Sequence, residues 1–101
     1  MKVIKAGAEL GDVRVVEWDG SLKQLQEMVD GYIEVVNQPY LTTDRVKIIV
    51  NEEGILKGLP INYNLNPYFY VGNVIFIGVE GENFTGLTDK EIYNVMYLLE
   101  F

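Results

Sequence analysis

Apolar and polar residues alternate over short stretches of this chain, and such alternation predicts strands. Val46 and Ile48 fall on one side of an extended segment, whereas Lys47 falls on the other. Elsewhere the stretches are rich in β-branched and aromatic residues, which also favour strands. Short turns join several of them, so we expect antiparallel pairing. The predicted strands are residues 1–6, 13–18, 32–36, 45–50 and 71–79.

Two segments instead repeat apolar residues at helical spacing. The first helix is expected over residues 21–30, and the second begins at Thr88. Ser21 and Gln24 have the spacing of a capping box, as do Thr88 and Glu91. Gly31 is expected to end the first helix in the left-handed conformation. The apolar stripes are Leu22, Leu25, Met28 and Val29 in the first helix, and Ile92, Val95, Met96 and Leu99 in the second.

These elements predict an α+β fold, with two helices packed on one face of a largely antiparallel sheet of about five strands. A chain of 101 residues is expected to form a single domain, residues 1–101. Residues 56–67 contain several Gly, Pro and Asn and are expected to be irregular. We expect one core, made mostly of Leu25, Met28, Ile33, Val35, Val46, Ile48, Val50, Ile75, Ile77, Ile92, Val95 and Leu99.

Composition restricts the location and the chemistry. Hydrophobic residues are 49% and charged residues 23% of the chain, as in soluble globular proteins. The sequence has no apolar run of membrane-spanning length, and its first residues do not have the pattern of a signal peptide, so we expect a cytoplasmic protein with no membrane partner. The chain has no Cys and no His, which excludes a thiolate nucleophile, an imidazole base and a Cys/His zinc site.

A catalytic role is the least favoured of three interpretations. Ser21 is the only serine, and helix capping accounts for it. Glu80, Glu82 and Asp89 could supply oxygens to a divalent cation, but their spacing matches no EF-hand loop, and acidic residues before a helix interact well with its dipole. We therefore expect no enzyme activity, no cofactor and no metal, although a carboxylate-dependent enzyme stays as the third interpretation.

The charge balance argues against duplex nucleic acid as a partner. Eight Lys and Arg against fifteen Asp and Glu give a net charge of -7, whereas duplex binding depends on many basic residues. A small anionic ligand needs only a few cations. Arg45 and Lys47 are two residues apart in a predicted strand and so share a face, either as a phosphate-binding patch or as an ordinary solvated face.

Aromatic residues and amides are interleaved over residues 62–70, in the second half of the irregular segment and just beyond it. Tyr63 and Tyr68 could stack on a base, and Asn62 could bond to its edge. With Arg45 and Lys47, they form the predicted ligand-binding set. In the alternative interpretation Phe69 is core, and the tyrosines cap the sheet or form a subunit contact. We also expect a homo-oligomer with an interface near residues 68–70, because the apolar surface is large for two short helices.

Three blocks of the sequence resemble the small proteins of phages and mobile elements classed as domain-of-unknown-function family 3846. The blocks are LQEMVDGYIEVV at residues 25–36, NEEGILKGLPIN at 51–62, and VGNVIFIG at 71–78 followed by ENFTGLTD at 82–89. The resemblance implies an accessory protein of phages or conjugative elements, often encoded beside antirestriction genes. Tyr63 stands where the resemblance leads us to expect a basic residue after Leu-Pro-x-Asn.

Two functions follow as expectations. The first is a non-enzymatic anti-defence protein that sequesters a nucleotide immune signal, with tyrosines stacking on its base and Arg45 or Lys47 contacting phosphate. The second is an acidic inhibitor that mimics nucleic acid and occupies a host defence or regulatory protein, which a net charge of -7 favours through electrostatic steering.

Overall fold

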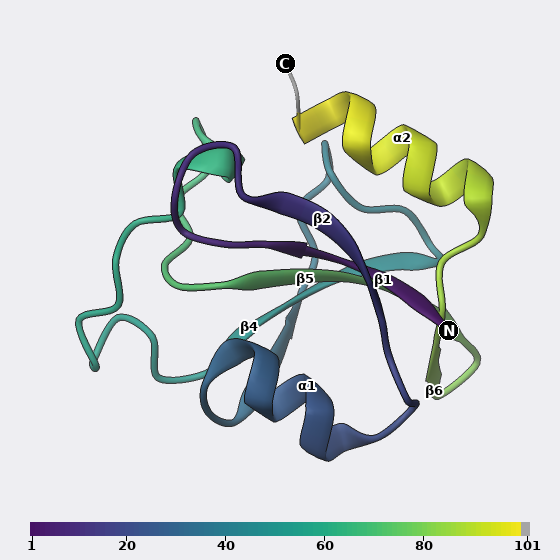
Figure 1. Ribbon diagram of the computed structural model, residues 1–101, viewed down its shortest axis with the longest axis horizontal. Coiled ribbons are helices and arrows are strands. Elements are labelled where there is room, and N and C mark those ends of the chain that lie inside the picture. The colour runs from purple at the N-terminus through teal and green to yellow at the C-terminus, as the bar shows by residue number, and fades with distance from the viewer. Residues whose placement is uncertain (100–101) are drawn as a thin grey trace.

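The fold is an α+β sandwich built on one six-stranded antiparallel sheet, which a computed structural model describes over residues 1–99 (Figure 1). The order of the strands is β2-β1-β5-β4-β3, and β6 also pairs with β5. The predicted α+β class and the antiparallel sheet are confirmed. The strands are β1 (Lys2–Ala6), β2 (Val13–Glu17), β3 (Ile33–Val36), β4 (Val46–Asn51), β5 (Val74–Glu80) and β6 (Asn83–Thr85).

Strand β5 lies at the centre of the sheet. One edge of β5 pairs with β4, with Ile48 opposite Phe76. Its other edge pairs first with β1, where Ile4 is opposite Phe76, and then with β6. Strand β6 is not among the five strands predicted from the sequence, because three residues that follow the turn at Gly81 are too few for a strand pattern to be recognised.

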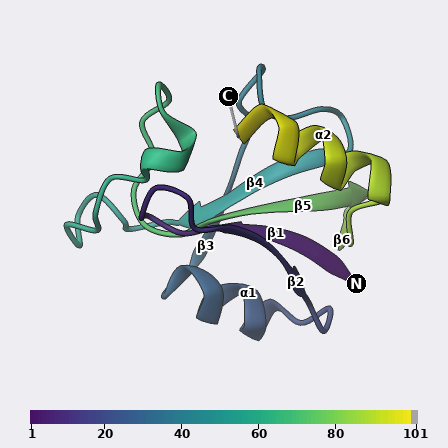
Figure 2. The same ribbon diagram turned by 45° about the horizontal axis from the view of Figure 1, so that its top comes forward.

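The two helices cover opposite faces of the sheet. Helix α1 (Leu22–Val29) lies beneath it and helix α2 (Asp89–Leu99) above it (Figure 2). The prediction that both helices share one face is therefore wrong. The reason lies in the central strands, which are apolar on both sides: Ile48 and Phe76 face α2, whereas Ile49 and Ile75 face α1. Each face needs its own apolar cover.

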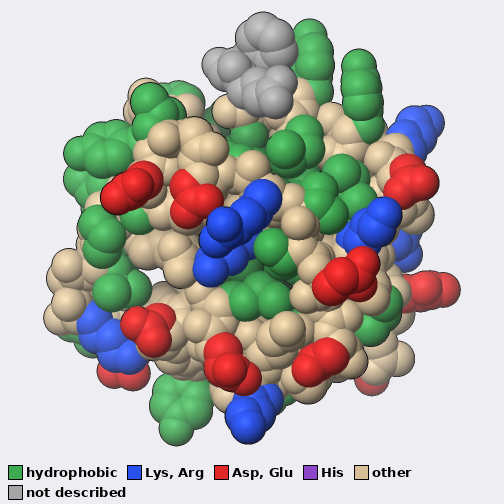
Figure 3. Space-filling view, in the orientation of Figure 1, with side chains coloured by type: hydrophobic (Ala, Val, Ile, Leu, Met, Phe, Trp, Pro, Cys, Tyr) green, Lys and Arg blue, Asp and Glu red, His purple; other side chains and the backbone are tan. Residues whose placement is uncertain are grey.

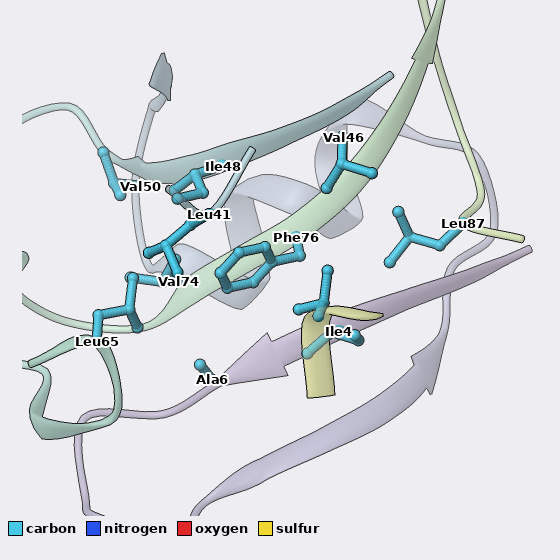
Figure 4. Close-up of a cluster of buried hydrophobic side chains, with 11 residues drawn as sticks. Ile4, Ala6, Leu41, Val46, Ile48, Val50, Leu65, Val74, Phe76 and Leu87 are labelled. Carbon is cyan, nitrogen blue, oxygen red and sulfur yellow. The ribbon is translucent and has the colours of Figure 1, made fainter. Parts of the chain in front are cut away.

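The larger cluster of buried side chains lies between the sheet and α2, on what we call the α2 face. Phe76 of β5 lies at its centre, near Ile48 of β4 and Ile4 of β1 (Figure 4). Val95 is the buried residue of α2, and Ile92, Met96 and Leu99 pack around the same cluster. Leu41 enters it from the loop before β4, and Leu65 from the short 3-10 helix η1 (Tyr63–Leu65). The connections as well as α2 therefore close this face.

The smaller cluster lies between the sheet and α1, on the α1 face. It is made of Val3, Trp18, Leu25, Val29, Ile49, Ile75 and Ile77. Seven of the twelve predicted core residues are buried, and four are half-buried. Val35 is 47% exposed, so its predicted burial is wrong. It lies on β3, the last strand of the sheet, where no further strand packs beside it.

The helix ends largely follow the predicted chemistry. Ser21 Oγ accepts the Gln24 N–H at 3.1 Å, while the Gln24 side chain accepts the N–H of Asp19 rather than that of Ser21. Asp30, not Gly31, takes the left-handed conformation at the end of α1, with φ of 65°. Asp tolerates this region because its short polar side chain can bond locally. Within residues 1–99, neither helix is long and apolar enough to cross a membrane.

Candidate functional site

The structure divides the predicted ligand-binding residues between the two ends of the sheet. Arg45 lies at the start of β4, where its carbonyl accepts the Val79 N–H. Asn62 lies at the other end of β5, where its amide donates to Gly72 O. Gly72 and Val79 are seven positions apart in the sequence, so at about 3.3 Å for each step these ends are separated by roughly 20 Å. Arg45 and Asn62 are therefore not brought into one cleft.

Arg45 is engaged in ion pairs at the start of α2. Its Nε donates to Glu91 Oε2 at 3.0 Å and its Nη2 to Glu91 Oε1 at 3.3 Å, a two-pronged contact. Glu80 lies 3.9 Å away on the other side. The hydrogen bond with Arg45 is the main cause of a lowered pKa for Glu91, and the same bond raises the pKa of Arg45. This guanidinium holds the end of the sheet to α2.

Lys47 lies in β4 and bonds to the loop that precedes this strand. Its Nζ donates to the carbonyl of Thr43 at 2.9 Å. Lys47 pairs with Ile77 across the sheet, and Ile77 faces α1, whereas the Arg45 side chain reaches α2. The prediction that Arg45 and Lys47 form one cationic patch on a shared face is therefore wrong, because the charged group of Lys47 bonds to Thr43 and that of Arg45 bonds to Glu91 of α2.

Asn62 and Asn64 form a buried brace between two loops. The Asn62 side chain is fully buried and donates to Ala6 O and Gly72 O at 3.0 and 2.8 Å. The Asn64 side chain donates to Gly7 O and Glu9 O, both at 2.7 Å, and accepts the Gly11 N–H. These amides satisfy carbonyls that would otherwise be buried without a partner. The Asn62 amide is thus occupied inside the protein.

The two candidate stacking residues lie in separate hollows. Tyr63 is exposed beside Leu10 and Ile61. Tyr68 is half-buried and stacks on Tyr40, with ring centroids 6.3 Å apart. No Lys or Arg is among the described residues that line either hollow. Each offers a flat ring for a base, but neither has a cation beside it for a phosphate.

A groove of about 250 Å³ beside β3 combines exposed apolar residues with carboxylates. Val36 of β3 and Val50 of β4 form its floor. One wall is the turn after β4, residues 52–56, and the other is residues 69–71. The side chains that give it its chemistry are the carboxylates of Glu34, Glu52 and Glu53, and the apolar groups of Ile55, Leu56 and Phe69. We call it the β3 groove.

Local chemistry fixes the shape of the turn in this groove. Asn51 is buried at the end of β4, where its amide donates to Val29 O and Asp30 O of α1. Its Oδ1 accepts the N–H of Glu53 at 2.8 Å, which pins the turn. A Cβ at Gly54 would lie 2.8 Å from Val71, so only glycine lets the turn approach the opposite wall this closely.

The β3 groove has the character of a contact surface. Ile55, Leu56 and Phe69 are 72%, 86% and 63% exposed, although each is large and apolar. Contiguous exposed apolar residues on a small protein mark interaction sites. Three carboxylates and no Lys or Arg line the groove within the described part of the chain, so its local charge is negative.

Few features of the sequence indicate this site. Glu34, Glu52 and Phe69 are far apart along the chain, and they meet only because β3 pairs with β4 and residues 69–71 return to the same end of the sheet. The alternative interpretation that places Phe69 in the core is wrong, because its side chain is exposed. The one local signal is Ile55-Leu56, two large apolar residues in a glycine-flanked turn where polar residues are usual.

A second exposed apolar surface lies over α2. Hydrophobic side chains project above this helix in Figure 3, and Tyr93, Tyr97 and Leu98 are its exposed members. Of the residues expected at a subunit interface, Phe69 is exposed, whereas Tyr68 and Tyr70 are half-buried. The homo-oligomer stays a prediction.

The carboxylates weighed as metal ligands have other surroundings. Glu80 lies beside Arg45, and Asp89 is in the first turn of α2. Glu82 is exposed in the turn between β5 and β6. Over residues 1–99, no three His, Cys, Asp or Glu side chains gather as a metal site would require.

Comparison with known proteins gives one match. The model of a family described as "Domain of unknown function (DUF3846)" matches residues 1–100, nearly the whole chain. No curated protein and no solved structure matches. The resemblance seen in the sequence is therefore confirmed, and it covers both helices and all six strands.

Proposed function

We propose that this chain, which belongs to the DUF3846 family, is a non-enzymatic binding protein that occupies a basic partner protein through its β3 groove. This is the second of the two functions expected from the sequence, the acidic inhibitor. The partner class follows from the family resemblance in the sequence, which suggests a host defence or regulatory protein.

The observation that carries the proposal is the chemistry of the β3 groove. An apolar floor and walls favour burial against a partner, at about 25 cal/mol for each Å² removed from water. Carboxylates around an apolar centre select a partner with Lys or Arg at matching positions. The net charge of -7 acts in the same direction, because it speeds encounter with a positively charged protein.

The nucleotide-sequestering function stays a prediction with less support. It needs an aromatic ring and a cation at one site. Tyr63 and Tyr68 offer rings, but Arg45 lies about 20 Å from Asn62 and is bonded to Glu91. A nucleotide site within one copy would have to draw its cation from elsewhere.

Affinity capture with charge variants tests the proposal. The full chain is immobilised and exposed to an extract of its host, and retained proteins are identified and quantified by mass spectrometry. The test variant is Glu52→Gln with Glu53→Gln, which neutralises two carboxylates of the β3 groove. The matched control is Glu80→Gln with Glu82→Gln, which removes the same charge at the other end of the sheet.

We expect the groove variant to retain at least about tenfold less of a basic partner protein, the size of effect for loss of close charge pairs. The control variant should retain as much as the wild type. Equal retention by both variants would overturn the proposal. So would the absence of any retained protein together with binding of a cyclic dinucleotide in calorimetry, which would restore the first function.

A further inference from the structure

Strand β3 is an edge of the sheet with one side open. It pairs with β4 alone, and Val35 is opposite Ile49. The N–H of Glu52 donates to Tyr32 O at 2.8 Å, which continues this ladder by one residue. Residues that bond to the same neighbour alternate along an antiparallel strand. Tyr32, Glu34 and Val36 therefore bond toward β4.

The remaining residues of β3 present their backbone to the open side. By the same alternation, the N–H and C=O groups of Ile33 and Val35 point away from β4. Outside the β3–β4 ladder, the described residues make no backbone hydrogen bond to the N–H or C=O of Ile33 or Val35. A row of unpaired backbone groups at a sheet edge is a template for another strand.

The open edge lies directly beside the β3 groove. Glu34 and Val36 place their side chains on the α2 face, where they line the groove. Val35 pairs with Ile49 and so places its exposed side chain on the α1 face. A strand added at this edge would present alternate side chains to these two surfaces, one acidic and one apolar.

We propose that β3 accepts an extended segment of the partner protein as an added strand, in which Lys or Arg alternates with Val or Ile. This inference rests on the proposed function and specifies how the partner binds. The basic side chains lie on the groove side, where their aliphatic stems cover Ile55 and Phe69 and their charges reach Glu34, Glu52 and Glu53. The β-branched side chains pack on Val35.

The charge of the groove argues against a second copy of this chain as the occupant of this edge. Pairing β3 with its own copy would bring two acidic grooves together, with Glu34, Glu52 and Glu53 of each copy on adjoining surfaces. Like charges placed together across an interface are unfavourable. The opposite edge of the sheet, β2, carries both Arg14 and Glu17 and does not select one sign of charge.

A substitution at Val35 separates strand addition from groove binding. Proline has no N–H, and at Val35 it removes only a donor that points to the open side. Val35→Pro thus blocks an added strand and leaves the side chains of the groove in place. Val35→Thr is the matched control, because it keeps both the N–H and the β-branched shape.

The probe is a fluorescein-labelled peptide of about ten residues in which Lys and Val alternate, a length that covers one strand. Its binding is followed by fluorescence anisotropy while the full chain is titrated. A second peptide carries N-methyl groups on alternate amides, which removes its ladder donors. A third replaces Lys with Glu. Circular dichroism and thermal unfolding confirm that each variant is folded.

We expect the Lys-Val peptide to bind the wild type and Val35→Thr alike, and Val35→Pro at least about tenfold more weakly. The N-methylated and Glu-Val peptides should not bind. Equal binding to Val35→Pro, or equal binding of the N-methylated peptide, would overturn strand addition. So would no binding of the Lys-Val peptide at about 1 mM.

Failure of this inference is distinguishable from failure of the proposed function. If Val35→Pro captures as much partner protein as the wild type while the Glu52→Gln, Glu53→Gln variant loses it, the groove binds without strand addition and only the further inference fails. If the groove variant also captures as much as the wild type, the proposed function fails with it.

Discussion

Buried amide side chains organise the loops of this protein at the scale of single residues. Asn51 joins the turn after β4 to α1, while Asn62 and Asn64 join the loop before β5 to the β1–β2 connection. Each satisfies backbone groups that secondary structure leaves without partners. The sequence predicted an amide-rich loop but assigned Asn62 to a ligand, because its partners, Ala6 and Gly72, are brought to it only by the fold.

Replacing Asn62 with Ala is expected to destabilise the fold. It removes two donors from buried carbonyls and the acceptor of the Asn64 N–H. Leaving several buried groups unsatisfied should cost about 2–4 kcal/mol in the free energy of unfolding. Urea denaturation measures it. The control Asn94→Ala, on the exposed surface of α2, should stay within about 0.5 kcal/mol of the wild type, and an equal effect of both would refute the role of the brace.

The Glu91 carboxylate makes the stability of the fold depend on pH in the acidic range. Its pKa is lowered mainly by the hydrogen bond with Arg45. Because the pKa of Glu91 is lowered in the folded state, its carboxylate stabilises the fold fully above the ordinary pKa of 4.5. This stabilisation is lost as the pH falls toward the lowered pKa.

We therefore expect the wild type to be more stable than Glu91→Gln at neutral pH, by about 1–2 kcal/mol, because Gln can still accept the Thr88 N–H but lacks the charge that bonds to Arg45. The difference should shrink as pH falls below about 4.5. Thermal unfolding over this pH range measures it. Glu82→Gln, at an exposed position, should show no such dependence, and a difference that stayed constant down to strongly acid pH would contradict the account.

At the scale of whole elements, two helices close two faces of one sheet. The helices, the cap at Ser21, the capping box of Thr88 and Glu91, and five of the strands could be predicted because they depend on neighbours in sequence. The face of the sheet that each helix covers could not be predicted. A period of two shows that Ile48 and Ile49 point to opposite sides, but not that both sides are buried, which depends on the central place of β4 and β5.

Substitutions in helix α1 test whether the α1 face of the sheet is a hydrophobic core. Leu25 is fully buried against the sheet, whereas Leu22 of the same helix is exposed. Leu25→Ala should lower the free energy of unfolding by about 2–5 kcal/mol, as is usual for a buried leucine. Leu22→Ala keeps the helix and should change it by less than about 0.5 kcal/mol. Chemical denaturation compares them, and a small effect at Leu25 would mean that the α1 face is not a core.

At the scale of the whole molecule, the fold separates its charged and aromatic groups. Arg45 and its carboxylate partners hold one end of the sheet to α2, the braced loops with Tyr63 lie at the other, and the β3 groove opens along an edge strand. The sequence shows which residue types are present but not the distances between them in the fold. The predicted ligand-binding set, drawn from residues 45–68, assumed that residues near in sequence are also near in space.

The central claim is that the β3 groove contacts a protein. Its most direct test is site-specific photo-crosslinking in cells that carry the native gene, with p-benzoylphenylalanine in place of Phe69. The control places the same group at Tyr93, an exposed aromatic position on α2, outside the groove. The account predicts that position 69 crosslinks to one protein with a basic segment and that position 93 does not. No crosslinked protein at position 69, or the same products from both positions, would contradict it.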